Sequence, residues 1–185
     1  DMMKVVNEAK VAVFDTNLTV ETLTYLLKNT KTTKVVDAVS SVKAKKLKGL
    51  VHLVDLLKVN HHEAEVLAEE PIVDHKSLVS VGKKLKAMGP ESLIITYGKE
   101  GSYLFHKDKI LRYTSTPLEV VNATGAGDAF TSHLIHGLVR NIPVEEAMVN
   151  ATAGARVTLK SMDSSGRINS EKLLVEKKEV SYERI

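Results

Sequence analysis

The chain has 185 residues, a formal net charge of +3 and a hydrophobic content of 43%. This length is sufficient for one well-packed domain, and the composition is typical of an ordinary soluble globular protein. The absence of cysteine excludes disulfides, thiolate catalysis and cysteine-ligated zinc. The sequence shows no apolar run of membrane-spanning length and no secretory-leader pattern, so a cytoplasmic location is expected.

Short apolar runs alternate along the chain with segments of helical periodicity. The runs at 11–14, 34–37, 54–59 and 92–96 predict buried strands, and 101–105 with 109–113 predicts a hairpin. Helices are expected at 19–28, in the lysine-rich segment that follows 34–37, and at 61–68, 74–88, after 125, after Pro143 and from about Ser170. Buried strands separated by helices favour an α/β fold with a mostly parallel sheet covered on both faces.

The most informative segment is Ala-Thr-Gly-Ala-Gly-Asp-Ala-Phe at 123–130, between a β-like run at 118–121 and an apolar-periodic helix. Glycines allow the backbone to approach a phosphate closely, and the first N–H groups of a helix have no intrahelical partners. Together with the helix dipole, they form an anion site. A carboxylate at Asp128 does not attract phosphate, so its useful role is to accept a proton from an attacking hydroxyl. The alternative is an ordinary helix start with turn glycines.

Residues 120–130 resemble the signature of the ribokinase-like (PfkB) sugar and nucleoside kinases, and further motifs extend the resemblance over about 11–160. The resemblance implies a three-layer α/β/α fold with a mostly parallel sheet. It also implies that the amides of Gly125, Ala126 and Gly127 form the anion hole for the transferred phosphoryl group, with Asp128 as the base. Asn122 and Ala123 replace the usual Asp and Thr near a monovalent-cation site of the family, which leaves dependence on such a cation open.

Asn60 and Glu63 match the N-x-x-E motif of the same family, which lies near magnesium and the phosphates. The resemblance implies that Glu63 acts on Mg²⁺ indirectly, through water. The alternative is a capping box, in which an asparagine at the N-cap and a glutamate at N3 satisfy each other's backbone groups. The two interpretations are compatible.

Two further motifs bear on nucleotide binding. Thr96, Gly98 and Gly101 resemble the family's T-x-G-x-x-G turn, which lines the nucleotide phosphates. Asn150 matches an asparagine that lies near the adenine in these kinases. Segments 15–19 and 37–44 resemble members that act on nucleosides, among which pseudouridine kinase is the most similar.

The resemblance predicts one domain, residues 1–185, forming the C-terminal, ATP-binding portion of a longer kinase whose N-terminal part and lid are absent. The expected activity is ATP-dependent phosphorylation of a hydroxyl on a sugar or nucleoside, with ATP and Mg²⁺, and the 185 residues alone are expected to be inactive. A homo-oligomer is open, and neither nucleic acid nor membrane is an expected partner. Alternatives are a non-catalytic nucleotide-binding module, a nucleic-acid surface at Lys43–Lys48 and a metal site at His133 and His136; the last two are less favoured.

Overall fold

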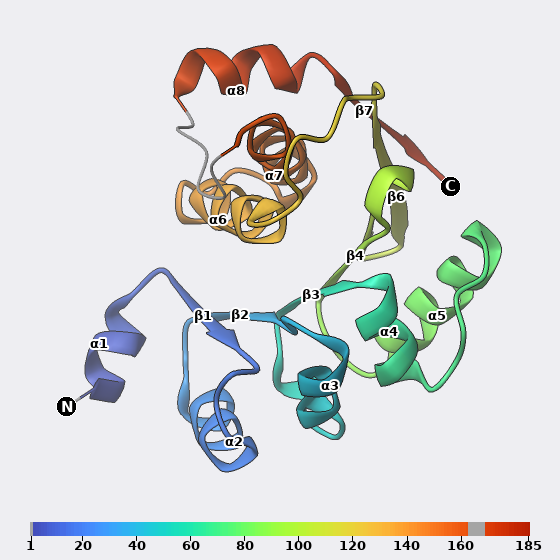
Figure 1. Cartoon of the computed structure of the whole chain (residues 1–185). Helices are drawn as coiled ribbons and strands as arrows, with labels where there is room; N and C mark the ends of the chain where they lie inside the picture. Colours follow the sequence, from blue (N-terminus) through green and yellow to red (C-terminus); the bar gives the residue numbers. More distant parts are fainter. Residues whose placement is uncertain (1, 163–168) are drawn as a thin grey trace. The chain divides into compact units, whose positions relative to one another are not determined.

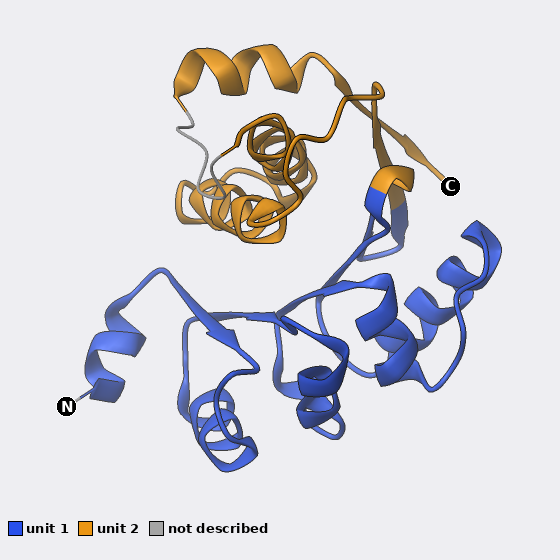
Figure 2. Cartoon of the chain, viewed as in Figure 1, with its two compact units in different colours: residues 1–98, 102–110 blue, residues 99–101, 111–185 orange. Residues whose placement is uncertain are grey.

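The computed structural model describes residues 2–162 and 169–185, and their contacts fall into two compact units (Figures 1 and 2). The first unit contains the residues up to 98 together with 102–110, and the second contains 99–101 and 111–185. Within the described part of the chain, no helix combines the length and the apolar character needed to cross a bilayer.

The first unit is built on a mostly parallel sheet. Strands β1 (Val11–Asp15), β2 (Thr33–Asp37), β3 (Leu56–Asn60) and β4 (Ser92–Thr96) pair in parallel in chain order, and β5 (Ser102–His106) is antiparallel to β4. The connecting helices are α2 (Val20–Asn29), α3 (Ser41–Ala44), α4 (His61–Ala68) and α5 (His75–Ala87), preceded by α1 (Met2–Glu8). The four predicted strands and the helices at 19–28, 61–68 and 74–88 are confirmed to within two residues.

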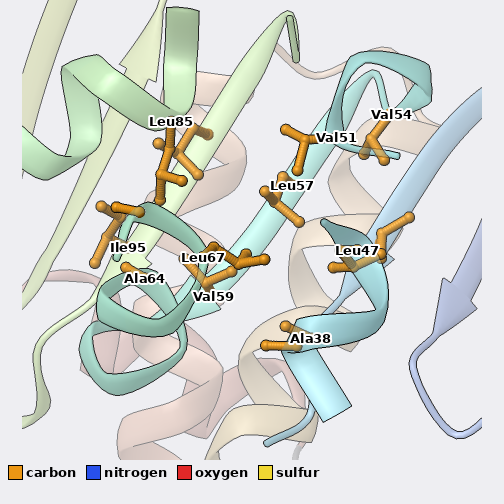
Figure 3. Packing of buried hydrophobic residues seen from close by; sticks show 14 of the residues in the cluster. Ala38, Leu47, Val51, Val54, Leu57, Val59, Ala64, Leu67, Leu85 and Ile95 are labelled. Carbon is orange, nitrogen blue, oxygen red and sulfur yellow. The ribbon is translucent and has the colours of Figure 1, made fainter. Parts of the chain in front are cut away.

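Local signals explain where these helices start. The Thr19 hydroxyl caps α2, and Asp74 forms a capping box with Ser77 at the start of α5. The hydrophobic core lies between these helices and the sheet (Figure 3), where Leu57, Ile95 and Leu85 are fully buried. Burying side chains of this size contributes about 1.5–3 kcal/mol each. This packing holds the strands in place, and with them the polar residues at the carboxyl ends of the strands.

The second unit combines an antiparallel strand pair with three helices. Strand β6 (Lys109–Ser115), whose first two residues belong to the first unit, pairs with β7 (Val180–Arg184), and the helices are α6 (Ala126–Val139), α7 (Val144–Leu159) and α8 (Ser170–Lys177). Helices α6 and α7 pack closely because glycines remove side chains at their contact. A Cβ at Gly137 would lie 2.8 Å from the Ala147 Cβ, and one at Gly154 would lie 2.5 Å from the His133 ring.

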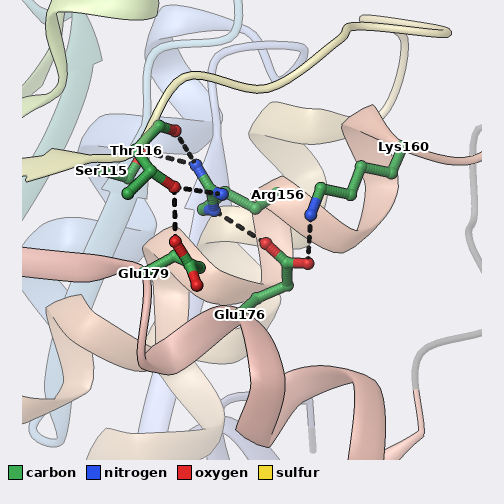
Figure 4. Close-up of polar contacts among 6 residues, drawn as sticks. All are labelled: Ser115, Thr116, Arg156, Lys160, Glu176 and Glu179. Carbon is green, nitrogen blue, oxygen red and sulfur yellow. Dashed lines mark hydrogen bonds and ion pairs between the residues drawn. The ribbon is translucent and has the colours of Figure 1, made fainter.

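A buried ionic network joins α7 to α8 and to the end of β6 (Figure 4). The Arg156 guanidinium is 3% exposed and donates to the Glu176 carboxylate at 2.8 Å and to the Ser115 hydroxyl at 2.8 Å. Thr116 accepts two further bonds, and Lys160 donates to the other Glu176 oxygen. Burial alone would raise the pKa of Glu176, but Lys160 and Arg156 outweigh it and lower the pKa.

Three sequence expectations differ from the structure. The β-like run at 118–121 is not a strand, because the Val121 N–H donates to the Leu159 carbonyl at the end of α7 rather than to a strand partner. The lysine-rich segment is not one helix: α3 gives way to 3₁₀ turns η1 (Lys45–Leu47) and η2 (Val51–Leu53) around Gly49, whose φ is +80°. Strand β7 was not predicted.

Candidate active site

The start of α6 presents backbone donors and a carboxylate together. Gly125 is the N-cap with φ 82° and ψ −6°, a left-handed conformation that favours glycine, and its carbonyl accepts from the Ala129 N–H at 2.8 Å. The N–H groups of Gly127 and Asp128 lie in the first turn, where no intrahelical acceptor is available. Both residues are exposed, and the Asp128 carboxylate makes no hydrogen bond or ion pair with another described residue. The helix end therefore has the chemistry of an anion site with an accessible base beside it.

The loop before α6 is anchored by Asn122. Its Oδ1 accepts from the Thr124 N–H at 2.9 Å, and its Nδ2 donates to the Met162 carbonyl at 3.2 Å. These bonds tie the glycine segment to the residues that follow α7. The same bonds decide whether a monovalent cation could bind here, because such a cation needs oxygen ligands. Residue 122 brings a neutral amide whose nitrogen faces Met162, so these two residues as placed do not fit a cation between them.

Two other predicted residues of the second unit, Gly101 and Asn150, lie close to neighbouring segments of the chain. Gly101 has φ +100°, and a Cβ there would lie 2.0 Å from the Tyr113 carbonyl oxygen, so the close approach of two backbone segments requires glycine. Asn150 is 9% exposed on α7, and its Nδ2 lies 3.9 Å from where a Cβ at Gly137 would stand. Its side chain therefore faces α6. The roles of Gly101 at phosphate and Asn150 at adenine stay predictions.

In the first unit, Asn60 and Glu63 form the expected capping box at the start of α4. The Glu63 N–H donates to Asn60 Oδ1 at 2.9 Å, and Glu63 Oε2 accepts from the Asn60 N–H at 2.8 Å. Asn60 Nδ2 donates to Glu63 Oε1 at 2.7 Å. Asn60 is the register partner of Thr96, so the carboxyl ends of β3 and β4 bring these three residues to one edge. Gly98 follows with φ +54° and open space around it.

A buried ion pair that sequence reasoning missed lies one strand away. Lys58 Nζ lies 3.0 and 3.2 Å from the two carboxylate oxygens of Asp37, and both residues are less than 10% exposed. Burial raises the pKa of Glu63, Lys58 opposes that rise, and Asp37 adds to it. The only sequence signal was a lysine inside an otherwise apolar strand, which requires a buried anionic partner.

The residues present are compatible with Mg²⁺ that binds together with the nucleotide, coordinated mainly by its phosphates. No group of three or more histidine or acidic side chains among the described residues is placed to hold a metal. Glu63 is 1% exposed and both of its oxygens accept from Asn60. Mg²⁺ commonly keeps several waters and binds through phosphates and one or two carboxylates, which needs no preformed cage.

The two less favoured alternatives find no support in the described residues. His133 Nδ1 lies 2.8 Å from the Ala129 carbonyl, and its ring packs on Gly154. Among the lysines, Lys46 donates to two backbone carbonyls of the β1–α2 connection, at 2.9 and 2.8 Å. Lys43 donates to Asn17, and Lys48 pairs with Glu69. Three of the four lysines in this segment are therefore engaged by neighbouring groups of the first unit, while Lys45 is exposed.

Comparison with known proteins shows which protein family the chain resembles. The model of the pfkB family carbohydrate kinases matches residues 5–170. A 1-phosphofructokinase of Haemophilus influenzae is 32% identical over 99 residues, which are 53% of this chain and 32% of that protein. The structure of a Clostridium perfringens protein provisionally assigned as a sugar kinase is 26% identical with a TM-score of 0.89, over 100% of this chain and 59% of that one.

A third comparison concerns the fold. The structure of Arabidopsis thaliana ribokinase complexed with ribose and ATP gives a TM-score of 0.82 at 21% identity, over 96% of this chain and 59% of that one. The ribokinase-like α/β fold with a mostly parallel sheet is thus confirmed. The chain spans about a third of the length of the 1-phosphofructokinase that it matches. It belongs to the PfkB family of carbohydrate kinases.

Proposed function

We propose that the protein transfers the γ-phosphoryl group of ATP to a hydroxyl of a sugar or nucleoside. The observation that supports this most is the start of α6, where a left-handed glycine cap, first-turn amides and the exposed Asp128 carboxylate share one helix end. Membership of a carbohydrate kinase family supports the same reaction class.

In this proposal the acceptor oxygen forms a bond to the γ-phosphorus as the bond to the ADP oxygen breaks. Asp128 takes the proton of the acceptor hydroxyl, and ADP is the leaving group. The amides of Gly125, Ala126 and Gly127 donate to the oxygens of the transferring group, where negative charge is concentrated. Mg²⁺ supplies charge neutralisation at the phosphates. Asn60, Glu63, Thr96, Gly98, Gly101 and Asn150 are proposed as nucleotide-binding positions, with Glu63 acting on Mg²⁺ through water.

The acceptor class is the finer part of the proposal. A sugar is favoured by the family, and a nucleoside such as pseudouridine by the sequences at 15–19 and 37–44. We also propose a cytoplasmic enzyme. Because the chain spans 59% of the compared structures, Asp1–Ile185 alone is expected to bind ATP and to transfer phosphate poorly. The alternative is a nucleotide-binding module without transfer activity.

The experiment separates binding from transfer. ATP binding to Asp1–Ile185 is measured by calorimetry, and ADP release is measured with ribose, fructose, adenosine and pseudouridine, on this chain and on the longest natural product of its gene. Asp128→Asn should keep the fold and ATP binding, while transfer by the active form falls about 10²–10⁴-fold. Glu146→Gln, an acidic residue in the first turn of α7, is the matched control.

The outcomes distinguish a kinase from a nucleotide-binding module without transfer activity. Transfer that is lost in Asp128→Asn and kept in Glu146→Gln supports the kinase. Near-normal turnover of Asp128→Asn removes this residue from the mechanism. ATP binding without transfer to any of the four acceptors, in both forms of the protein, favours the non-catalytic module.

A further inference from the structure

A pocket lies in the first unit, at the opposite end of the sheet from Asn60 and Thr96. Strand β5 runs antiparallel to β4, and its register places Phe105 opposite Leu93, near the amino end of β4. Thr96 is the last residue of β4, three residues beyond Leu93. At about 3.3 Å per residue, this puts the two positions roughly 10 Å apart along the strand. The pocket therefore does not belong to the candidate active site.

The pocket has an apolar floor and a basic rim. Its volume is about 400 Å³, within the range of small-molecule sites. Phe105 and Ile110 line it, and Phe105 is 2% exposed because its ring packs where a side chain at position 82 would stand. Lysines from two parts of the unit surround the floor: Lys83 and Lys86 from α5, Lys107 from the turn after β5, and Lys109 from the start of β6.

The rim carries more positive than negative charge, and three of its four lysines have no ionic partner within the described residues. Asp108 is the one acidic residue that lines the pocket within the described residues, against four lysines. Lys83, Lys86 and Lys107 make no ion pair or side-chain hydrogen bond with another residue of the part that the structure describes. The neighbouring Lys84, by contrast, pairs with Glu70 at 3.2 Å. Lys83 and Lys86 are three residues apart, so both lie on the helix face that borders the pocket.

We propose that this pocket binds a small organic molecule that carries two phosphate groups. The lysine ammonium is a compact point charge that suits phosphate oxygens, and the rim offers it from both sides of the pocket. The apolar part of the lining suits the carbon skeleton between the phosphates, because contact with Ala87 and Ile110 removes apolar surface from water. A nucleic acid would need stacking surfaces that this rim lacks, since Phe105 is buried beneath it.

The test measures binding of fructose 1,6-bisphosphate and of pyrophosphate to the full 185-residue chain by calorimetry. The bisphosphate should bind saturably and more tightly than pyrophosphate, which has no carbon skeleton. The double variant Lys83→Gln with Lys86→Gln should weaken it about tenfold or more, since each charge-assisted bond carries that order of affinity. Lys107 has φ +50°, a conformation that asparagine tolerates, so Lys107→Asn removes charge without straining the turn.

Two controls make the result decisive. The double variant Lys76→Gln with Lys84→Gln removes the same charge from α5 away from the pocket, and it should change affinity by less than about twofold. Gly127→Val, at the start of α6, should leave the binding unchanged. The proposal is overturned if no saturable binding occurs, if both double variants weaken binding equally, or if Gly127→Val abolishes it. Tighter binding of a single-stranded oligonucleotide, lost in the same lysine variant, would also overturn it.

Discussion

Asn122 and Met162 are joined by a hydrogen bond of 3.2 Å, which the side-chain amide of Asn122 donates and a carboxylate could not. The same side chain accepts from the Thr124 N–H, so it connects the glycine segment to the residues that follow α7. An aspartate would keep the second bond and turn a carboxylate oxygen toward a carbonyl oxygen. Two acceptors facing each other favour a bound cation between them.

We therefore predict that Asn122→Asp lowers the free energy of unfolding by about 1 kcal/mol in tetramethylammonium chloride, the typical value of one hydrogen bond. Potassium chloride at equal ionic strength should recover part of that loss. The wild-type chain should show no difference between the two salts. Urea unfolding measures both, and equal stabilisation of both proteins by potassium would contradict the prediction.

The two glycines of the turn after β4 should differ sharply. Gly101→Ala introduces a Cβ 2.0 Å from the Tyr113 carbonyl oxygen at φ +100°, and Gly98→Ala meets open space at φ +54°. We expect Gly101→Ala to destabilise the protein by more than about 3 kcal/mol, and Gly98→Ala by about 1 kcal/mol. Thermal unfolding checks the order. Similar values for the two variants would mean that backbone relaxation absorbs the contact at Gly101.

The capping box of α4 should contribute more than that of α5, because its glutamate is buried. Asn60→Ala removes the cap and leaves the 1% exposed Glu63 carboxylate without its side-chain donor. The expected loss is about 1 kcal/mol for the cap and about 1–3 kcal/mol for the unsatisfied carboxylate. Asp74→Ala, in the exposed box of α5, should cost about 1 kcal/mol. Denaturant titration of both variants tests the difference, and equal losses would show that the Glu63 carboxylate gains a replacement partner when Asn60 is truncated.

The Arg156–Glu176 pair should make stability depend on pH. Because Lys160 and Arg156 lower the pKa of the buried Glu176 below its usual 4.5, its contribution is fully present above that value. It is lost as the pH falls through the lowered pKa. Glu176→Gln should therefore cost about 3 kcal/mol at pH 7 and progressively less at a pH well below 4.5. Glu171→Gln, in the exposed first turn of α8, should cost little at either pH. A pH-independent loss in Glu176→Gln would contradict this assignment.

Much of the fold was encoded locally. The apolar run at 92–96 is β4 itself, and the Asn60 and Glu63 pair set the start of α4, because a cap and its helix are only three residues apart. The glycines at 125 and 127 likewise marked the start of α6. At both helix starts the deciding interaction lies within one turn of the residues that carry the signal, so the sequence alone determined where the helix begins.

Tertiary structure decided what depends on distant partners. The apolar run at 118–121 has strand character, yet its Val121 amide bonds to Leu159, so no strand forms. Strand β7 exists because it pairs with β6, and the paired residues Ser115 and Val180 are 65 positions apart in the chain. The burial of Lys58 against Asp37 depends on the register of β2 beside β3. Local periodicity carries no information about which backbone or charge will lie opposite, and that is settled only when the chain packs.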